Sequence, residues 1–140
     1  MPGRGKQGGE YGVTIYLAVA AGGALGAVGR YIVISRTGAL LGTGFPFGTL
    51  VVNVAGSFLL GAVVAAAASG AAAPGTADNV LAFLGVGVLG GFTTFSTFAL
   101  DVAYLAGRRA LRAAALYVVV SVIFSIAAFA AGLSLAHILA

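Results

Sequence analysis

The sequence predicts an all-α integral membrane protein with four membrane-spanning helices, the third of them broken in mid-membrane. Of the 140 residues, 61% are apolar and only 7% are charged, and the mean hydropathy is +1.12, far outside the balance of a soluble globular domain. No charged side chain occurs from Thr37 through Ala77, a length of about two membrane crossings at roughly 20 residues each. Lipid is therefore the expected solvent.

The first span is predicted at 13–35, after a polar, glycine-rich segment, 1–12, that we expect to be flexible. This apolar stretch is too long for the core of a signal peptide, and it carries Arg30 inside it. Residues 13–140 then form a single four-helix transmembrane domain. The remaining spans are predicted at 47–68, 79–105 and 112–138, joined by short connections at 36–46, 69–78 and 106–111.

The positions of the basic residues indicate that they flank membrane spans and do not form a nucleic-acid-binding surface. Four of the seven lie beside apolar spans, namely Arg36, Arg108, Arg109 and Arg112, and Arg4 and Lys6 precede the first span. We therefore expect no nucleic-acid partner. The imbalance between the two sides is small, so it favours connecting loops in the cytoplasm only weakly and leaves the orientation undecided.

The residue types needed for enzyme or metal chemistry are scarce. There is no cysteine and only one histidine, His137, near the end of the chain. No nucleophile and base, and no cluster of metal-ligating side chains, can be assembled from the sequence. An enzyme is not expected.

Two spans carry stripes of uncharged polar side chains spaced four residues apart, which places each stripe on one helix face. The stripes are Thr49, Asn53 and Ser57 in the second span, and Tyr117, Ser121 and Ser125 in the fourth. A single serine or threonine in such a place commonly bonds back to its own helix. Two aligned stripes on separate helices favour a shared polar route through the membrane.

The third span contains the strongest local signal. Four glycines weaken its helix and are followed, after Phe92, by Thr93 and Thr94, which predicts a break near 90–93. The alternative is a continuous, tightly packed glycine-rich helix. A break frees backbone groups that must find partners inside the protein. Freed carbonyls suit a monovalent cation, and the start of the next half-helix suits an anion.

Further side chains near this break are candidates for a role in ion passage. Phe95 and Phe98 share a helix face, and they are either core filler or a pair whose positive ring edges meet an anion. Arg30 is either a structural anchor or a source of positive potential in a vestibule. Asp101 is expected to pair with a basic residue such as Arg108, and its role is open.

Four helices are few for enclosing a polar route, so an oligomer is the expected working unit. Close helix approach is favoured by the small-residue pairs Gly22 and Gly26 in the first span and Gly87 and Gly91 in the third. Such pairs either join subunits or pack helices within one chain, and for any single pair we favour packing within the chain.

Three segments, in order along three spans, resemble the Fluc-type fluoride channels, also called the CrcB family. The segments are GGALGAVGRY at 22–31, GTLVVN at 48–53 with GSF at 56–58, and GGFTTFSTF at 90–98. The fourth span fits through its polar stripe, whereas residues 1–12 lie outside the match. The third segment is the most specific of the set.

The resemblance implies a fluoride-selective passive channel in the cell membrane, built as an antiparallel, dual-topology homodimer with two pathways. It implies a central structural sodium ion, Na+, held by the backbone carbonyls of Gly90 and Thr93. The family's pathway residues correspond here to Thr49, Asn53, Phe95, Phe98, Tyr117, Ser121 and Ser125. Asp101 stands where the family more often has glutamate. The implied partners are fluoride, membrane lipid and a second copy of the chain.

Two other classes remain as alternatives. A small proton-coupled exporter would need an acidic residue in mid-membrane, and Glu10, Asp78 and Asp101 all lie near span ends. A non-conducting scaffold subunit could share the fold and would show no ion flux. Uncharged donor stripes fit a small, strongly hydrated anion, which needs closely spaced hydrogen-bond donors but no deep lysine or arginine to trap it.

Overall fold

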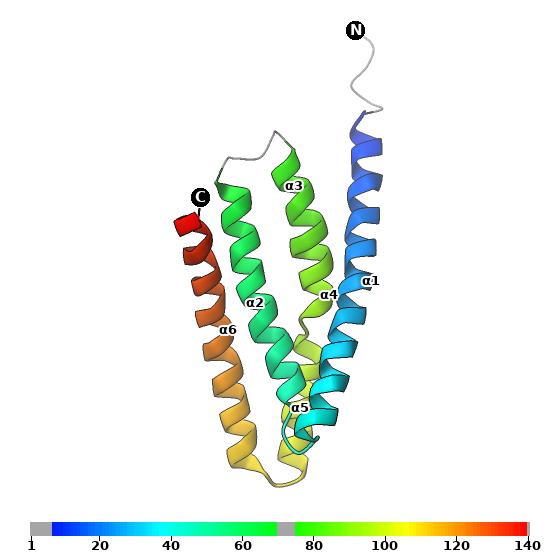
Figure 1. The fold of residues 1–140 in the computed structure, drawn as a ribbon. Helices are drawn as coiled ribbons and strands as arrows, with labels where there is room; N and C mark the ends of the chain where they lie inside the picture. Colours follow the sequence, from blue (N-terminus) through cyan, green and yellow to red (C-terminus); the bar gives the residue numbers. More distant parts are fainter. Residues whose placement is uncertain (1–6, 70–74, 140) are drawn as a thin grey trace.

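The structure is a computed structural model that describes residues 7–69 and 75–139, and this part of the chain is helical apart from short connections. The elements in order are α1 (Gln7–Leu41), α2 (Phe47–Ala68), α3 (Thr76–Val80), η1 (Leu81–Leu89), α4 (Gly90–Phe92), α5 (Phe95–Gly107) and α6 (Leu111–Leu139). The third to sixth of these follow one another as a single interrupted helix (Figure 1).

Within the described residues, four helices are long and apolar enough to cross a membrane. They are Gly12–Leu41, Phe47–Ala68, Thr76–Gly107 and Leu111–Leu135. The prediction of four spans is thus confirmed, and α2 has the bounds predicted for the second span.

The first helix extends past its predicted end, because no breaker occurs before Gly42, which has a left-handed φ of 79°. At its other end, residues 7–12 of the segment expected to be flexible belong to α1. Residues 1–6 of that segment, with Arg4 and Lys6, lie outside the described residues. So do residues 70–74 of the predicted 69–78 connection.

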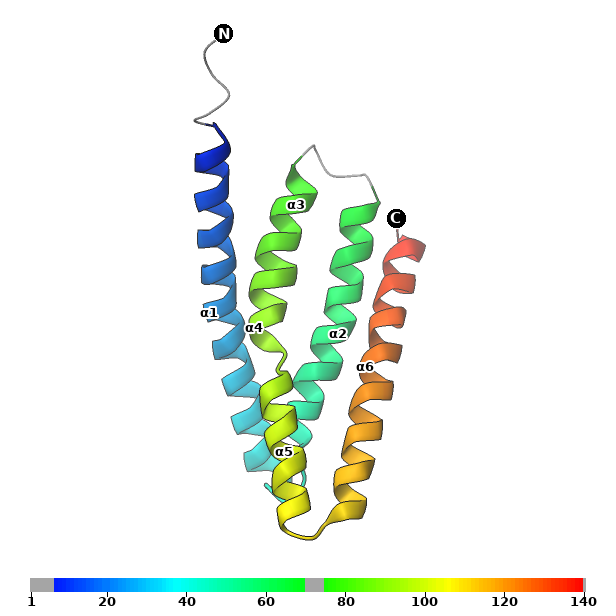
Figure 2. The ribbon, with the colours of Figure 1, turned by 180° about the vertical axis from the view of Figure 1, so that it is seen from behind.

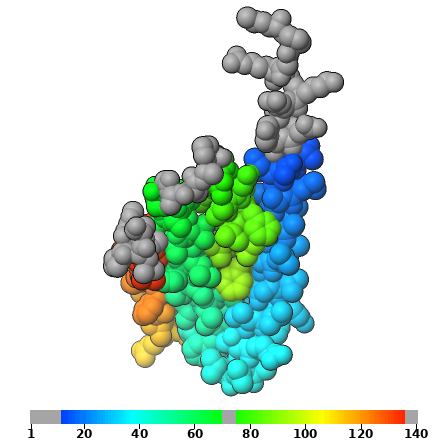
Figure 3. All heavy atoms as spheres, turned by 45° about the horizontal axis from the view of Figure 1, so that its top comes forward, coloured from blue at the N-terminus to red at the C-terminus, as the bar shows by residue number. Residues whose placement is uncertain are grey.

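The spans stand side by side as two packed pairs. α1 packs along η1 and α4, and α2 packs along α6, with further contacts between α2 and η1. Figures 1 and 2 show α1 and α6 at opposite edges of the bundle, and Figure 3 shows α1, the first half of the third span and α2 in direct succession. The start of α1 and the end of α6 lie at one end, and the turns at 42–46 and 108–110 lie at the other.

Glycines set how closely the pairs approach. A Cβ added to Gly26 would meet the Val88 carbonyl oxygen, and one added to Gly91 would meet the Gly23 carbonyl oxygen. The glycine pairs of the first and third spans therefore pack helices within one chain, which confirms the reading that the sequence favoured. Gly61 and Gly132 serve the α2 and α6 pair in the same way, although no sequence pattern indicated this pair of glycines.

The helix leading to the break is not regular α-helix. η1 is a π-helix of 9 residues, and at its end the Gly90 N–H points to the carbonyls of Gly85 and Gly87. π segments are rare and widen the helix locally, often at functional sites. The glycines predicted only a weakened helix, so this widening is a feature that the sequence did not reveal.

Candidate functional site

The break in the third span lies at Thr93 and Thr94, between α4 and α5. Both residues have extended backbone, with ψ of 160° and 118°. A break was predicted near 90–93, and the extended residues lie at the C-terminal edge of that stretch. The reason is capping: the Thr94 hydroxyl oxygen accepts a hydrogen bond from the Thr97 N–H at 3.2 Å, which starts α5 at Phe95 while Gly90 and Gly91 stay helical.

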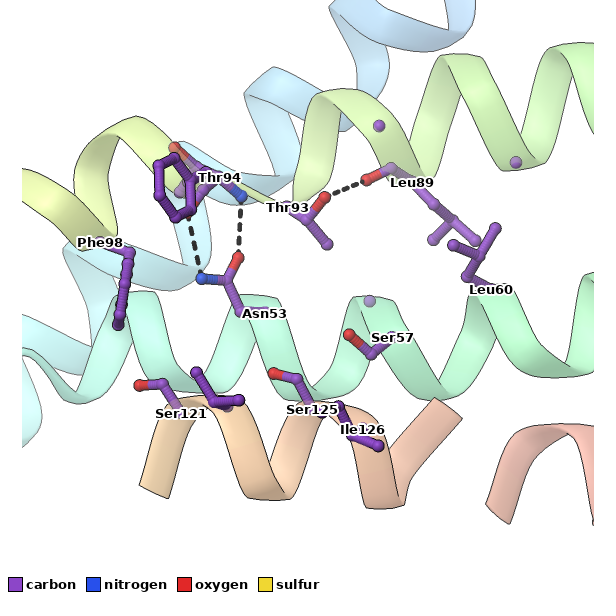
Figure 4. Close-up of a pocket in the computed structure, with 15 residues that line it drawn as sticks. Asn53, Ser57, Leu60, Leu89, Thr93, Thr94, Phe98, Ser121, Ser125 and Ile126 are labelled. Atoms are coloured by element: carbon purple, nitrogen blue, oxygen red, sulfur yellow. Dashed lines mark hydrogen bonds between the residues drawn. The ribbon is translucent and has the colours of Figure 1, made fainter. Parts of the chain in front are cut away.

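Asn53 of α2 binds the broken backbone with both ends of its carboxamide. Its Nδ2 donates to the Thr94 carbonyl oxygen at 3.1 Å, and its Oδ1 accepts from the Thr94 N–H at 2.8 Å. Figure 4 shows the two bonds side by side. Asn53 thus replaces the helical partners that Thr94 loses, and one hydrogen of its Nδ2 remains free for another acceptor.

Arg30 of α1 binds the other extended residue. Its Nη1 donates to the Thr93 carbonyl oxygen at 3.2 Å, and its side chain is half-buried. The sequence suggested either an anchor at the membrane surface or a vestibule charge for Arg30, and neither included this contact. The two residues are 63 positions apart, so no local pattern could have indicated the pairing.

The carbonyls of Gly90 and Thr93 are both released from regular helix bonding. The Thr94 N–H, which would reach Gly90 in a continuous helix, donates to Asn53, and the Thr97 N–H donates to the Thr94 hydroxyl instead of to Thr93. Freed carbonyls are suitable ligands for Na+. Gly90 therefore fits the expected role. The Thr93 oxygen has a second lone pair to offer, but the Arg30 charge bound to it raises the cost of a cation there.

A pocket of about 440 Å³ lies beside the break, between α2, α6 and the third span. It brings together most of the residues that the sequence indicated, from three separate spans (Figure 4). Of the predicted pathway and sodium residues, its lining includes Asn53, Gly90, Thr93, Phe95, Phe98, Ser121 and Ser125, and Ser57 of the second-span stripe joins them. Among the described residues, no charged side chain lines it.

The serine stripe of α6 enters this pocket with an unused hydroxyl. Ser121 is 4% exposed, and its buried Oγ has no hydrogen-bond partner within the described structure. Buried hydroxyls are nearly always paired, because an unpaired one loses its bonds to water without replacement. Ser121 is therefore ready to bind an acceptor that comes from outside the chain.

The two phenylalanines lie at different depths. Their ring centroids are 5.8 Å apart with an interplanar angle of 39°. Phe98 packs inward, with its centroid 5.3 Å from that of Tyr117, whereas Phe95 is 80% exposed on the surface of the chain. Both rings line the pocket, but only Phe98 is fixed by neighbours on another span.

Two predicted pathway residues, Thr49 and Tyr117, lie beyond this pocket. Tyr117 is fully buried between the rings of Phe45 and Phe98, and the hydroxyls of Thr49 and Ser121 both lie beside the Tyr117 hydroxyl. Thr49 also lines a second pocket of about 270 Å³, which includes Asp101 and the 42–46 turn. The rings of Phe45, Phe98 and Tyr117 therefore lie between the two pockets along the polar stripes.

The partner predicted for Asp101 is wrong. Asp101 Oδ2 accepts a hydrogen bond from the Tyr117 hydroxyl at 3.1 Å, and no ion pair with Arg108 forms in the described residues. Arg108 instead donates to the Tyr104 hydroxyl at 3.3 Å and lies over that ring. The short 108–110 turn makes α5 and α6 a helical hairpin, which brings positions equally far from the turn together. That geometry was the signal available for the pairing of Asp101 with Tyr117.

Comparisons with known proteins agree with these features. Residues 17–133 match the family described as CrcB-like protein, Camphor Resistance (CrcB). A protein of Rhodospirillum centenum named fluoride-specific ion channel FluC is 53% identical over 123 residues, which cover 88% of this chain and 95% of the relative.

Two further relatives carry similar names. A fluoride-specific ion channel FluC 1 of Nitrobacter hamburgensis is 46% identical over 126 residues, covering 90% of this chain and 98% of the relative. A FluC of Agrobacterium fabrum is 49% identical over 117 residues, covering 84% and 91%. All three names denote ion channels rather than enzymes. With a family match that spans most of its length and relatives of this similarity, the chain is a multi-pass membrane protein that belongs to the CrcB family.

Proposed function

We propose that the protein is a fluoride-selective passive channel that works as an antiparallel homodimer with two pathways and a central structural Na+. The observation that carries the proposal is the uncharged pocket beside the break, in which the buried Ser121 hydroxyl lacks a partner. The names of the relatives supply the identity of the anion. Fluoride would pass down its gradient without coupling to another ion.

The pocket suits a small, strongly hydrated anion. Hydroxyls of Ser57, Ser121 and Ser125 and the second Nδ2 hydrogen of Asn53 converge on it from α2 and α6. Together they can replace part of the hydration shell of fluoride. Because no lysine or arginine of the described part of the chain lines the pocket, the anion would be stabilised but not trapped, as conduction requires.

A second copy of the chain supplies what one copy leaves open. Phe95 is 80% exposed although it lines a pocket with polar groups, and such a pocket cannot face hydrocarbon without a large cost. A partner chain that covers this face would enclose the route, and the two pockets of the dimer would give two pathways. The antiparallel arrangement itself rests on the family resemblance.

The sodium ion would lie at the break, held by the Gly90 and Thr93 carbonyls of both copies. These two carbonyls give two oxygens from each chain, so the remaining ligands of an ion bound to one chain would come from the partner. The ion would fix the two breaks against each other. Arg30 would then share the Thr93 oxygen with the cation or move away from it.

Ion flux from liposomes tests the proposal. Purified protein should release fluoride rapidly, as read by a fluoride electrode, and should release chloride far more slowly, with no dependence on a proton gradient. Equal flux of both anions would contradict selectivity. Flux that requires a proton gradient would indicate an exporter, and the absence of flux from a well-folded protein would indicate a scaffold. Repeating the assay without sodium tests the cation separately.

A further inference from the structure

The turn between α5 and α6 holds an arginine where the backbone favours glycine. Arg109 has φ of 60°, its N–H donates to the Ala106 carbonyl at 2.9 Å, and the Ala110 N–H donates to the Leu105 carbonyl at 3.0 Å. These bonds form a Schellman helix end, whose left-handed residue is usually glycine because a side chain adds strain. The backbone thus gains nothing from an arginine here, and what the residue adds is its guanidinium group.

Three guanidinium groups gather at this turn without an acidic partner. The side chains of Arg108, Arg109 and Arg112 are all exposed, and no ion pair involves them in the described residues. Asp101 is bonded to Tyr117, and Asp78 lies in α3 at the other end of the bundle. A cluster of unpaired arginines presents many donors in planar forks, the arrangement that suits phosphate oxygens.

The turn is expected at the depth of phospholipid headgroups. It joins the ends of two candidate membrane spans, Thr76–Gly107 and Leu111–Leu135, at one end of the bundle (Figures 1 and 2), and the ends of spans meet the boundary of the hydrocarbon. Tyr104 is half-exposed one helical turn before it, as expected of an interfacial aromatic residue. The Arg108 guanidinium lies 5.4 Å from the centre of the Tyr104 ring, which holds that group near the boundary.

We propose that the arginines of the α5–α6 turn, Arg108, Arg109 and Arg112, bind the phosphate headgroup of an anionic phospholipid. Charge complementarity and membrane depth select this occupant, because a soluble phosphate compound would match the charge but not the depth. The turn connects the helix of Phe98 to the helix of Ser121, and the buried cluster of Leu105, Ala114 and Tyr117 lies next to it. A bound lipid therefore clamps α5 and α6 together and raises the resistance of the protein to unfolding.

Native mass spectrometry of the full-length protein tests the site, with phosphatidylglycerol and phosphatidylcholine titrated into the same detergent. An arginine near an anionic surface contributes about a fivefold gain in affinity, so three predict a preference for phosphatidylglycerol of about a hundredfold. The R108Q/R109Q/R112Q variant should bind both lipids equally. Equal binding by the unaltered protein, or an unchanged preference in the variant, would overturn the proposal. If millimolar inorganic phosphate abolished the retention of phosphatidylglycerol, the arginine cluster would be assigned to soluble phosphate instead.

The lipid preferences of single-arginine variants distinguish a specific headgroup site from a surface that is merely basic. Arg36 is exposed near the same end, on α1, so R36Q removes an equal charge and should leave the lipid preference within about twofold, whereas R109Q should lower it about fivefold. Equal losses in the two variants would contradict a specific site. R109G keeps the left-handed turn, so it should lower the preference without lowering the melting temperature measured in the absence of anionic lipid. A lower melting temperature would show that Arg109 serves the fold.

Discussion

Asn53 and Thr94 are joined by two hydrogen bonds, through which one side chain takes over both backbone groups of a residue 41 positions later in the chain. In a soluble protein, water could have satisfied the same groups. In the membrane the amide is the partner that makes an extended residue tolerable at that depth. The family resemblance suggests Asn53 as a pathway residue, and the structure shows that its side chain holds the backbone of the break in place.

Replacing Asn53 by alanine should therefore destabilise the protein and not only alter conduction. The substitution leaves a backbone N–H and a carbonyl without partners, at a cost of roughly 1–3 kcal/mol. The melting temperature in detergent should fall clearly. It is measured as the temperature at which the size-exclusion peak of the folded protein is lost. The matched control is Asn79→Ala, because Asn79 is exposed on α3. Similar melting temperatures for the two variants would mean that Asn53 does not support the break.

Ser121→Ala should reduce fluoride conduction without lowering the stability of the protein, unlike the Asn53 variant. Since the buried Oγ has no partner, removing it costs no hydrogen bond within the chain and should leave the melting temperature unchanged or slightly higher. Fluoride flux should fall about tenfold if the hydroxyl contributes one hydrogen bond to the passing ion. Ser134→Ala is the control on the same helix, because Ser134 is exposed and bonds back to the Ala130 carbonyl. Undiminished flux in Ser121→Ala would remove this hydroxyl from the pathway.

Phe98→Ile tests whether the inner aromatic ring contributes more than bulk. The change keeps an apolar side chain beside Tyr117 but removes the positively polarised ring edge, so fluoride flux should drop while the protein still assembles. Phe95→Ile should act in the same direction. Phe124→Ile, on an exposed face of α6 outside the pocket, should leave flux unchanged. The measurements are electrode-detected flux and size-exclusion chromatography, and full flux in Phe98→Ile would exclude an electrostatic role for the ring.

Gly26→Ala should weaken the contact between α1 and the third span. The added Cβ would meet the backbone of Val88 and Phe92, which can yield only if the helices separate, at a cost of about 1–3 kcal/mol. Gly107→Ala is the matched control, because a Cβ there has no neighbour within 4 Å. The melting temperature should fall for the first variant alone. An unchanged value would show that α1 can shift without loss of packing.

The spans and the break followed from local properties of the sequence. The bounds of α2 could be predicted because Pro46 precedes its apolar run and a connection follows Ala68. The position of the break shifted by a residue or two because the Thr94 side chain, rather than the glycines, decides where α5 starts. The helix α1 begins earlier than the predicted first span, because the polar and glycine-rich residues before residue 13 also adopt helix.

The contacts that secure the site are of long range, and no periodicity reveals them. Arg30 and Asn53 stand out in the sequence because polar groups are costly in a membrane, but their partners are backbone groups that become free only where the third span breaks. The expected Asp101 to Arg108 pairing failed for a related reason. Opposite charge predicted the partner, whereas the hairpin geometry placed a buried tyrosine hydroxyl closer to the carboxylate.

The chain order of the groups that secure the break has a consequence for biogenesis. Arg30 and Asn53 belong to the first two spans, which leave the ribosome before Thr93 and Thr94 do. Because synthesis proceeds from the N-terminus, both partners are synthesised before the interrupted third span. The order of the spans therefore favours pairing of the broken backbone as soon as it enters the bilayer, where unpaired backbone groups are costly.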